Sequence, residues 1–231
     1  MSAFPIRNLL LNSLLLLLLF SACSPSIVKN FRKEDALAVN RTDFYPFFPA
    51  VDSTLLFTMQ VDFRKNNLSG ILLIKSVQPD VYRLVFTTHF GMSIFDLEFN
   101  QGLFRVNYCM DVLNKKRVMQ LLENDFRILL FLNLEAEQDS SNIYKHKNDS
   151  TLEIHRTKNI YYLKDTKNET LLAIEASHFL GSFRYDFSDY INRFPSVIRI
   201  KYGRIGLKMQ LEKIHPHLDD PQEVQVKQPS L

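Results

Sequence analysis

The sequence contains no tryptophan, only six glycines and only two cysteines among its 231 residues. It also lacks the short motifs of common chemistries: there is no GxSxG nucleophile elbow, no glycine-rich phosphate loop and no HExxH zinc motif. Its 28 lysines and arginines nearly balance its 25 aspartates and glutamates, so the chain has no electrostatic footprint for nucleic acid. These absences argue against a serine hydrolase, a nucleotide-binding protein, a zinc protease and a nucleic-acid-binding protein.

Apolar residues are abundant instead. Phenylalanine occurs 19 times, and hydrophobic residues make up 46% of the chain. Such a chain has ample apolar surface to bury in a core or to line a cavity.

The N-terminus is typical of a bacterial export signal. Residues 1–8 carry one positive charge, at Arg7, and residues 9–20 form an apolar run that falls short of the ~20 residues needed to span a bilayer. The run ends in Phe20-Ser21-Ala22-Cys23, which resembles a bacterial lipobox. An ordinary secretory signal cleaved after Ala22 is the alternative.

Under the lipobox interpretation, Cys23 carries a covalent diacylglycerol and an N-acyl chain, and we expect no other cofactor and no metal. Two or three acyl chains hold a protein stably on a membrane, whereas a single chain binds reversibly. Cys109 then has no partner in its own chain, which excludes a disulfide framework. We expect Cys109 to be a small buried apolar residue, with a reactive thiol as the alternative.

We therefore divide the chain into a signal peptide (1–22), a lipidated cysteine with its tether (23–52), one folded domain (53–214) and a polar tail (215–231). Without Arg7, 27 basic residues face 25 acidic ones in the mature chain. Inside the tether, the aromatic stretch 44–48 either plugs one end of the core or borders a ligand cavity. We expect a monomer.

A period of two in the apolar residues predicts about a dozen antiparallel strands. The predicted strands cover residues 54–63, 68–76, 81–87, 93–100, 103–108, 143–147, 152–156, 160–163, 171–177, 182–187, 196–202 and 207–214. Short turns separate most of them, and a sheet of that many strands should curl. The predicted fold is mainly β: an incomplete antiparallel barrel with one principal helix covering its concave side.

That helix is predicted over residues 114–134, where apolar residues recur at helical spacing. Asp111 or Asn114 is the predicted N-cap. Lys115, Lys116 and Arg117 form a basic first turn, which we interpret as a solvated face, with a patch facing anionic lipid headgroups as the alternative.

The search for catalytic residues yields one weak pair. Asp96 and Glu98 share a strand face, and such a pair is far more often the wet side of a half-buried strand than a catalytic dyad. The histidines show no carboxylate partners at metal-ligand spacing. We therefore expect no enzymatic activity.

The turn between the third and fourth strands is unusual because its tip, Thr88-His89-Phe90-Gly91, contains a large apolar residue. Turn tips are usually polar. On a membrane-anchored protein, Phe90 beside Gly91 is suited to dip into a bilayer or to meet an apolar partner. The alternative is that Phe90 folds back onto the core.

This segment resembles the outer-membrane lipoprotein receptor family LolB. The resemblance rests on Tyr82-Arg83-Leu84, Thr87, Phe90-Gly91 and Phe95-Asp96-Leu97-Glu98, with the helix after residue 114 and the closing hairpin Val197-Ile198-Arg199-Ile200 to Leu207-Lys208-Met209-Gln210-Leu211. It implies an incomplete barrel with an apolar cavity that shields lipoprotein acyl chains, and it implies that Phe90 engages the bilayer. The missing tryptophans and the aromatic stretch 44–48 depart from the family pattern.

The resemblance also implies partners and a place in the cell. The partners would be lipoprotein acyl chains, a periplasmic LolA-like carrier and the outer membrane. Residues 24–30 contain no acidic cluster, which favours a lipid anchor that faces the periplasm. The candidate cavity-lining residues are Leu55, Phe57, Met59, Val61, Leu72, Ile74, Leu84 and Phe86, which periodicity alone cannot separate from ordinary core. Two alternatives stay open: a non-catalytic accessory lipoprotein that binds a protein partner of an envelope assembly, and a hydrolase with a nucleophile and base in contact.

Overall fold

The structure is a computed structural model that describes residues 26–34, 52–134, 142–178, 181–192 and 194–215. The predicted signal peptide, Cys23, the aromatic stretch 44–48 and nearly all of the polar tail lie outside these residues.

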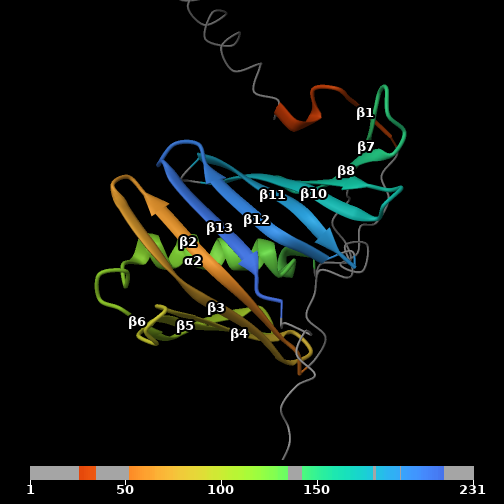
Figure 1. Cartoon of the computed structure of the whole chain (residues 1–231). Helices are drawn as coiled ribbons and strands as arrows, with labels where there is room; N and C mark the ends of the chain where they lie inside the picture. Colours follow the sequence, from red (N-terminus) through yellow and green to blue (C-terminus); the bar gives the residue numbers. More distant parts are fainter. Residues whose placement is uncertain (1–25, 35–51, 135–141, 179–180, 193, 216–231) are drawn as a thin grey trace, which may run out of the picture.

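Within the described residues, thirteen strands form one antiparallel sheet that curls around a helix (Figure 1). The strands are β1 (Phe31–Lys33), β2 (Thr54–Phe63), β3 (Asn66–Gln78), β4 (Val81–Thr87), β5 (Ser93–Asn100), β6 (Leu103–Cys109), β7 (Asn142–His146), β8 (Leu152–Thr157), β9 (Ile160–Asp165), β10 (Thr170–His178), β11 (Gly181–Ile191), β12 (Phe194–Tyr202) and β13 (Leu207–Lys213). Their order across the sheet is β1-β7-β8-β9-β10-β11-β12-β13-β2-β3-β4-β5-β6, so among the described strands β1 and β6 form the two edges. The predicted incomplete barrel is confirmed.

The strands form because apolar residues alternate with polar ones and the curled sheet buries only one face of each strand. The pairing of β13 with β2 sets Leu211 opposite Met59 and Met209 opposite Val61. Three of these four side chains are buried and Val61 is half-buried. The closing hairpin and the first long hairpin therefore form one continuous apolar inner wall.

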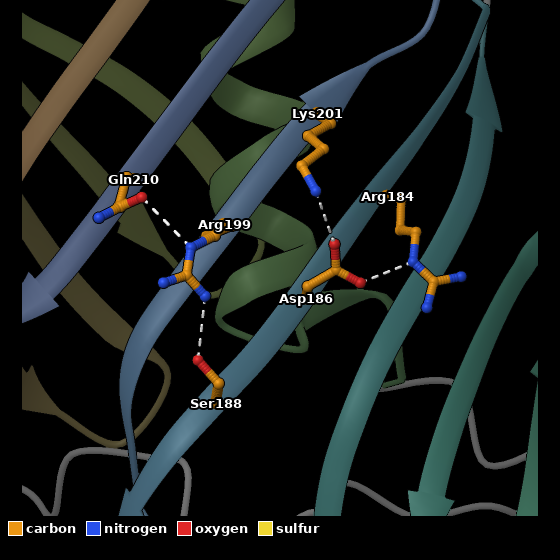
Figure 2. A network of polar contacts seen from close by, with 6 residues as sticks. All are labelled: Arg184, Asp186, Ser188, Arg199, Lys201 and Gln210. Atoms are coloured by element: carbon orange, nitrogen blue, oxygen red, sulfur yellow. Dashed lines mark hydrogen bonds and ion pairs between the residues drawn. The ribbon is translucent and has the colours of Figure 1, made fainter.

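The outer face of β11, β12 and β13 is polar (Figure 2). Asp186 accepts from Arg184 Nε at 2.6 Å and lies 3.4 Å from Lys201 Nζ. Arg199 bridges β11 and β13, because it donates to Ser188 Oγ at 3.2 Å and to Gln210 Oε1 at 3.3 Å. Partly exposed contacts of this kind contribute little stability. Their main effect is to keep this outer face of the sheet in contact with solvent.

The helix α2 (Lys116–Leu129) lies inside the curl, and a short 3₁₀ turn, η3 (Leu132–Leu134), follows it. The predicted segment 114–134 is therefore helical only in part, because Phe131 takes a φ of 54° that breaks the helix. The predicted N-caps are wrong. Lys115 is the N-cap, and its side chain makes no capping hydrogen bond. Asn114 lies in the preceding turn instead, where its N–H donates to the Met110 carbonyl.

A short segment inside the predicted tether contributes to the sheet. Residues Ser26–Val28 form a 3₁₀ turn, η1, and β1 pairs with β7 at the sheet edge. Ile27 is buried against Ile154 and Tyr161, and its backbone N–H donates to Glu175 Oε2 at 3.1 Å. The twelve predicted strands do not include β1, because three residues are too few to show an alternating pattern.

Scarcity of glycine leaves ordinary residues in the left-handed region at several turns. In the two-residue β5–β6 turn, Gln101 has a φ of 48° and Gly102 a φ of 79°. Two positive φ values define a type I′ turn, in which asparagine is preferred at the first position. Gln101 therefore holds a conformation that costs most L-residues ~1–2 kcal/mol.

We predict that Gln101→Asn raises the free energy of unfolding by up to about 1 kcal/mol, because asparagine tolerates this conformation. Chemical denaturation measures the change. Gln78→Asn on the extended strand β3 is the control and should bring no gain. Equal effects of the two substitutions would contradict the turn assignment.

Candidate functional site: an apolar cavity at one end of the barrel

A cavity of about 400 Å³ lies between α2 and the inner wall of the sheet. Its volume falls in the range of ~300–1,000 Å³ that is usual for small-molecule sites. It is lined by Met59, Val61, Phe63, Arg64, Leu68, Phe86, Phe95, Leu113, Arg117, Val118, Leu121, Leu122, Ile205, Leu207 and Met209. Thirteen of these fifteen residues are apolar, so the cavity suits a ligand that is mostly hydrocarbon.

The cavity lies at one end of the barrel. Its walls come from the β2–β3 turn, the end of β4, the start of β5, the start of β13 and the N-terminal half of α2. Around the C-terminal half of α2, a second space of only about 20 Å³ remains between Leu129, Leu130 and the strands. The helix thus fills one end of the curl and leaves the other end hollow.

The predicted lining residues divide between these two regions. Met59, Val61 and Phe86 line the large cavity, whereas Leu55, Phe57 and Ile74 line the small space. Leu72 and Leu84 are fully buried and line neither of the two. Sequence reasoning missed the walls from α2 and from the β12–β13 turn; the apolar stripe of the helix was a usable signal for Val118, Leu121 and Leu122.

Contacts near the middle and C-terminal end of α2 hold the helix in place. Arg127 Nη2 donates to the Gly102 carbonyl at 2.6 Å and to Glu123 at 2.9 Å. The Phe126 ring packs edge-on against Phe95 of β5 with centroids 5.9 Å apart. These contacts fix the end of α2 that lies away from the large cavity.

The buried carboxyl of Asp125 joins α2 to the opposite wall. Its Oδ1 accepts hydrogen bonds from the hydroxyls of Tyr185, at 2.6 Å, and of Tyr202. Its Oδ2 is buried without a hydrogen-bond partner among the described residues. Burial raises the pKa of Asp125 to about 7, although the two tyrosine hydroxyls act to lower it. Near neutral pH the helix is therefore held by a carboxyl that is partly protonated.

We predict that stability falls as the pH rises from about 4 to about 7. The folded protein binds the Asp125 proton up to pH ~7 and the unfolded chain only up to ~3.8, so raising the pH costs the folded state up to about 4 kcal/mol at 1.36 kcal/mol per pKa unit. Asp125→Asn should flatten this dependence, which thermal unfolding between pH 4.5 and 8 would measure.

The matched control for that measurement is Asp111→Asn, in the exposed loop after β6. It should keep the pH dependence of the unsubstituted protein. An unchanged pH dependence in Asp125→Asn would contradict the proton-linked attachment of α2.

The tip of the β4–β5 turn carries the most exposed apolar residue described. Phe90 is 94% exposed and Met92 is 63% exposed. The turn is closed by the Thr88 N–H bond to the Met92 carbonyl and by Gly91, which has a φ of 81°. Phe90 therefore does not fold back onto the core, and the turn holds it outward.

Other apolar residues are exposed at the same end of the barrel. β6 ends beside the start of β5, because Cys109 pairs with Phe95 and the Met110 N–H bonds to the Ile94 carbonyl. The loop that follows exposes Met110 and, at 65%, Val112. The Phe90 tip, this loop and the large cavity thus lie at one end of the sheet.

The Asp96 carboxylate has a structural partner. It accepts from Arg83 Nε at 3.0 Å and Nη2 at 2.6 Å, and this pairing holds the pKa of Asp96 below its usual range. A general acid needs the opposite shift. Cys109 is buried, and burial raises the pKa of its thiol, which is the direction away from a reactive thiolate.

One serine–histidine contact is present. Ser196 Oγ lies 3.1 Å from His215 Nε2 on the protein surface, outside both cavities.

Among the described residues, no group of three or more histidine, cysteine, aspartate or glutamate side chains is placed so that it could hold a metal ion. The helices in that part of the chain are all too short or too polar to cross a membrane.

Among solved structures, the chain is similar to a LolA superfamily protein from Nitrosomonas europaea, with a TM-score of 0.46 and 9% identity over 73% of this chain and 86% of that one. It is also similar to a domain from Vibrio parahaemolyticus described as an outer membrane lipoprotein-sorting protein, with a TM-score of 0.39 and 9% identity over 75% of this chain and 86% of that one. Protein-family models and curated proteins each return no match.

Proposed function

We propose that the protein binds acyl chains in the large cavity and, held at the outer membrane by lipid on Cys23, receives lipoproteins from a periplasmic LolA-like carrier and inserts them into the bilayer. The observation that carries this proposal is the apolar cavity of about 400 Å³ at the end of the barrel that also exposes Phe90. Each methylene moved from water into such a cavity contributes ~0.8 kcal/mol.

The cavity also suits transfer without an energy source. Its walls are broad and apolar, so an acyl chain exchanges one apolar environment for another when it passes to a membrane. Binding of that kind depends on chain length rather than on a specific polar anchor. An accessory lipoprotein that only binds a protein partner has no need of such a cavity, which favours acyl binding over that alternative.

Affinity for saturated acyl chains should rise roughly fourfold per added methylene and level off once the cavity is full. Narrowing the cavity with Val118→Trp should weaken binding and lower the chain length at which affinity levels off, because Val118 lines the cavity from α2 and the indole takes up part of its volume. Titration with a fluorescent fatty acid, and its displacement by chains of graded length, measures both effects. Since the protein lacks tryptophan, the new indole also reports by its emission whether it lies in the apolar cavity.

Leu103→Trp, at an exposed position on β6, is the matched control and should bind like the unsubstituted protein. Full binding by a folded Val118→Trp variant would sink the assignment of the cavity as the acyl site. A melting temperature no lower than that of the unsubstituted protein establishes that the variant is folded.

We predict that Phe90→Glu leaves folding intact, because the side chain is almost fully exposed, but impairs delivery of lipoproteins to the outer membrane. A charge at the tip opposes contact with the hydrocarbon of a bilayer. Fractionation of cells that depend on the variant measures where lipoproteins accumulate. His89→Glu adds a like charge to the same turn and should impair delivery less; normal delivery with Phe90→Glu would argue against membrane contact.

A further inference from the structure

The only two polar residues in the lining of the large cavity are both arginines. Arg64 lies in the two-residue turn between β2 and β3, and Arg117 lies in the first turn of α2. Both are exposed. They come from segments 53 positions apart in the sequence and meet at the same cavity, which is otherwise lined by hydrocarbon.

Among the described residues, these two arginines have no acidic partner, in contrast to three other arginines of the sheet and helix. Arg83, Arg127 and Arg184 each bind a carboxylate at 2.6–2.9 Å. In the part of the chain that the structure describes, neither Arg64 nor Arg117 forms an ion pair, and the lining contains no carboxylate. The charge at the entrance of the cavity is therefore not neutralised by its lining.

The residues next to the two arginines in the sequence are basic, and the nearest acidic residue on β2 lies on the other face of its strand. Lys65 follows Arg64, and Lys115 and Lys116 precede Arg117. The nearest acidic residue along β2, Asp62, alternates with the lining residues Val61 and Phe63 and so lies on the other face of the strand; it accepts from Asn67 at 2.5 Å. The Arg64 guanidinium lies 5.2 Å from the centroid of the Phe63 ring, which keeps it beside the cavity wall.

We propose that the cavity prefers an acyl chain that carries an anionic headgroup, with the chain inside and the phosphate or carboxylate against Arg64 and Arg117. The planar guanidinium of arginine matches both groups, and the hydrogen bonds to them are charge-assisted. A lysophospholipid, a fatty acid and an anionic phospholipid of the neighbouring bilayer share this chemistry. A triacylated cysteine has no anion of its own, so a lipoprotein would occupy the apolar cavity without using the two arginines, and the preference concerns membrane lipids that bind in the same cavity.

This inference rests on the acyl-binding part of the proposed function and narrows its ligand. The test compares three probes by isothermal titration calorimetry, below the concentrations at which they aggregate. They are 1-myristoyl lysophosphatidic acid, 1-myristoylglycerol with the same chain and no charge, and glycerol 3-phosphate with the charge and no chain. The expected result is about tenfold or tighter binding of the anionic lipid over the neutral one, and no binding of glycerol 3-phosphate.

Arg64→Gln and Arg117→Gln should each reduce the preference, and the double variant should bind the two myristoyl probes equally, because it loses affinity for the anionic probe. Both positions are exposed, so the variants should keep the melting temperature of the unsubstituted protein. Arg32→Gln on β1, at the far edge of the sheet, removes the same charge away from the cavity and should keep the full preference.

The outcomes distinguish this inference from the function it rests on. Equal binding of the two myristoyl probes by the unsubstituted protein, or an undiminished preference in the double variant, overturns the anionic preference and leaves acyl binding standing. Binding of glycerol 3-phosphate as tight as that of the anionic lipid reveals a plain phosphate site and also overturns it. Binding of neither lipid overturns both proposals.

Discussion

The packing of α2 against the inside of the curled sheet is the contact on which the rest of the structure depends. A sheet whose described strands end at two edges cannot bury its concave face by closing on itself, so a helix has to cover that face. The C-terminal half of α2 does so tightly, through Phe126, Leu129 and the Arg127 bond to the Gly102 carbonyl. The N-terminal half leaves space, and that difference along one helix creates the cavity.

The contacts that attach α2 to the sheet also determine which parts of the cavity wall could change position if a ligand binds. Asp125, Tyr185 and Tyr202 lie between the filled and hollow ends, so they fix the middle of α2 to β11 and β12. Beyond this point the cavity is lined by the first two turns of the helix, by the facing ends of β2 to β5 and of β13, and by the β2–β3 and β12–β13 turns. Under the proposed function, we expect a ligand to enter at the end of the barrel that exposes Phe90 and Val112.

Much of the fold could be predicted from the sequence, because alternation of apolar residues is a local signal and most of the strands are joined by short turns. The three-residue strand β1 was missed because it carries no period and is held by pairing with β7. The helix was placed correctly but its ends were not, since turn contacts at Met110 and the conformation of Phe131 decide them.

The candidate site was less predictable. Leu72 and Met59 show the same alternation, yet Leu72 is buried away from the cavity and Met59 lines it, because alternation shows which face of a strand is buried and not what lies against that face. Arg64 and Arg117 are far apart in the sequence, and only the fold brings them to one entrance. Asp125 was visible in principle as a polar residue on the apolar stripe of the helix.

The central claim is that the hollow end of the barrel holds an acyl chain. Native mass spectrometry of the protein purified from its own membrane, followed by organic extraction and identification of the released lipid, tests it most directly. The account predicts a population with one acyl-bearing ligand per chain, which decreases when Val118→Trp narrows the cavity. A protein that carries no lipid and takes none up from added fatty acids or phospholipids would contradict it.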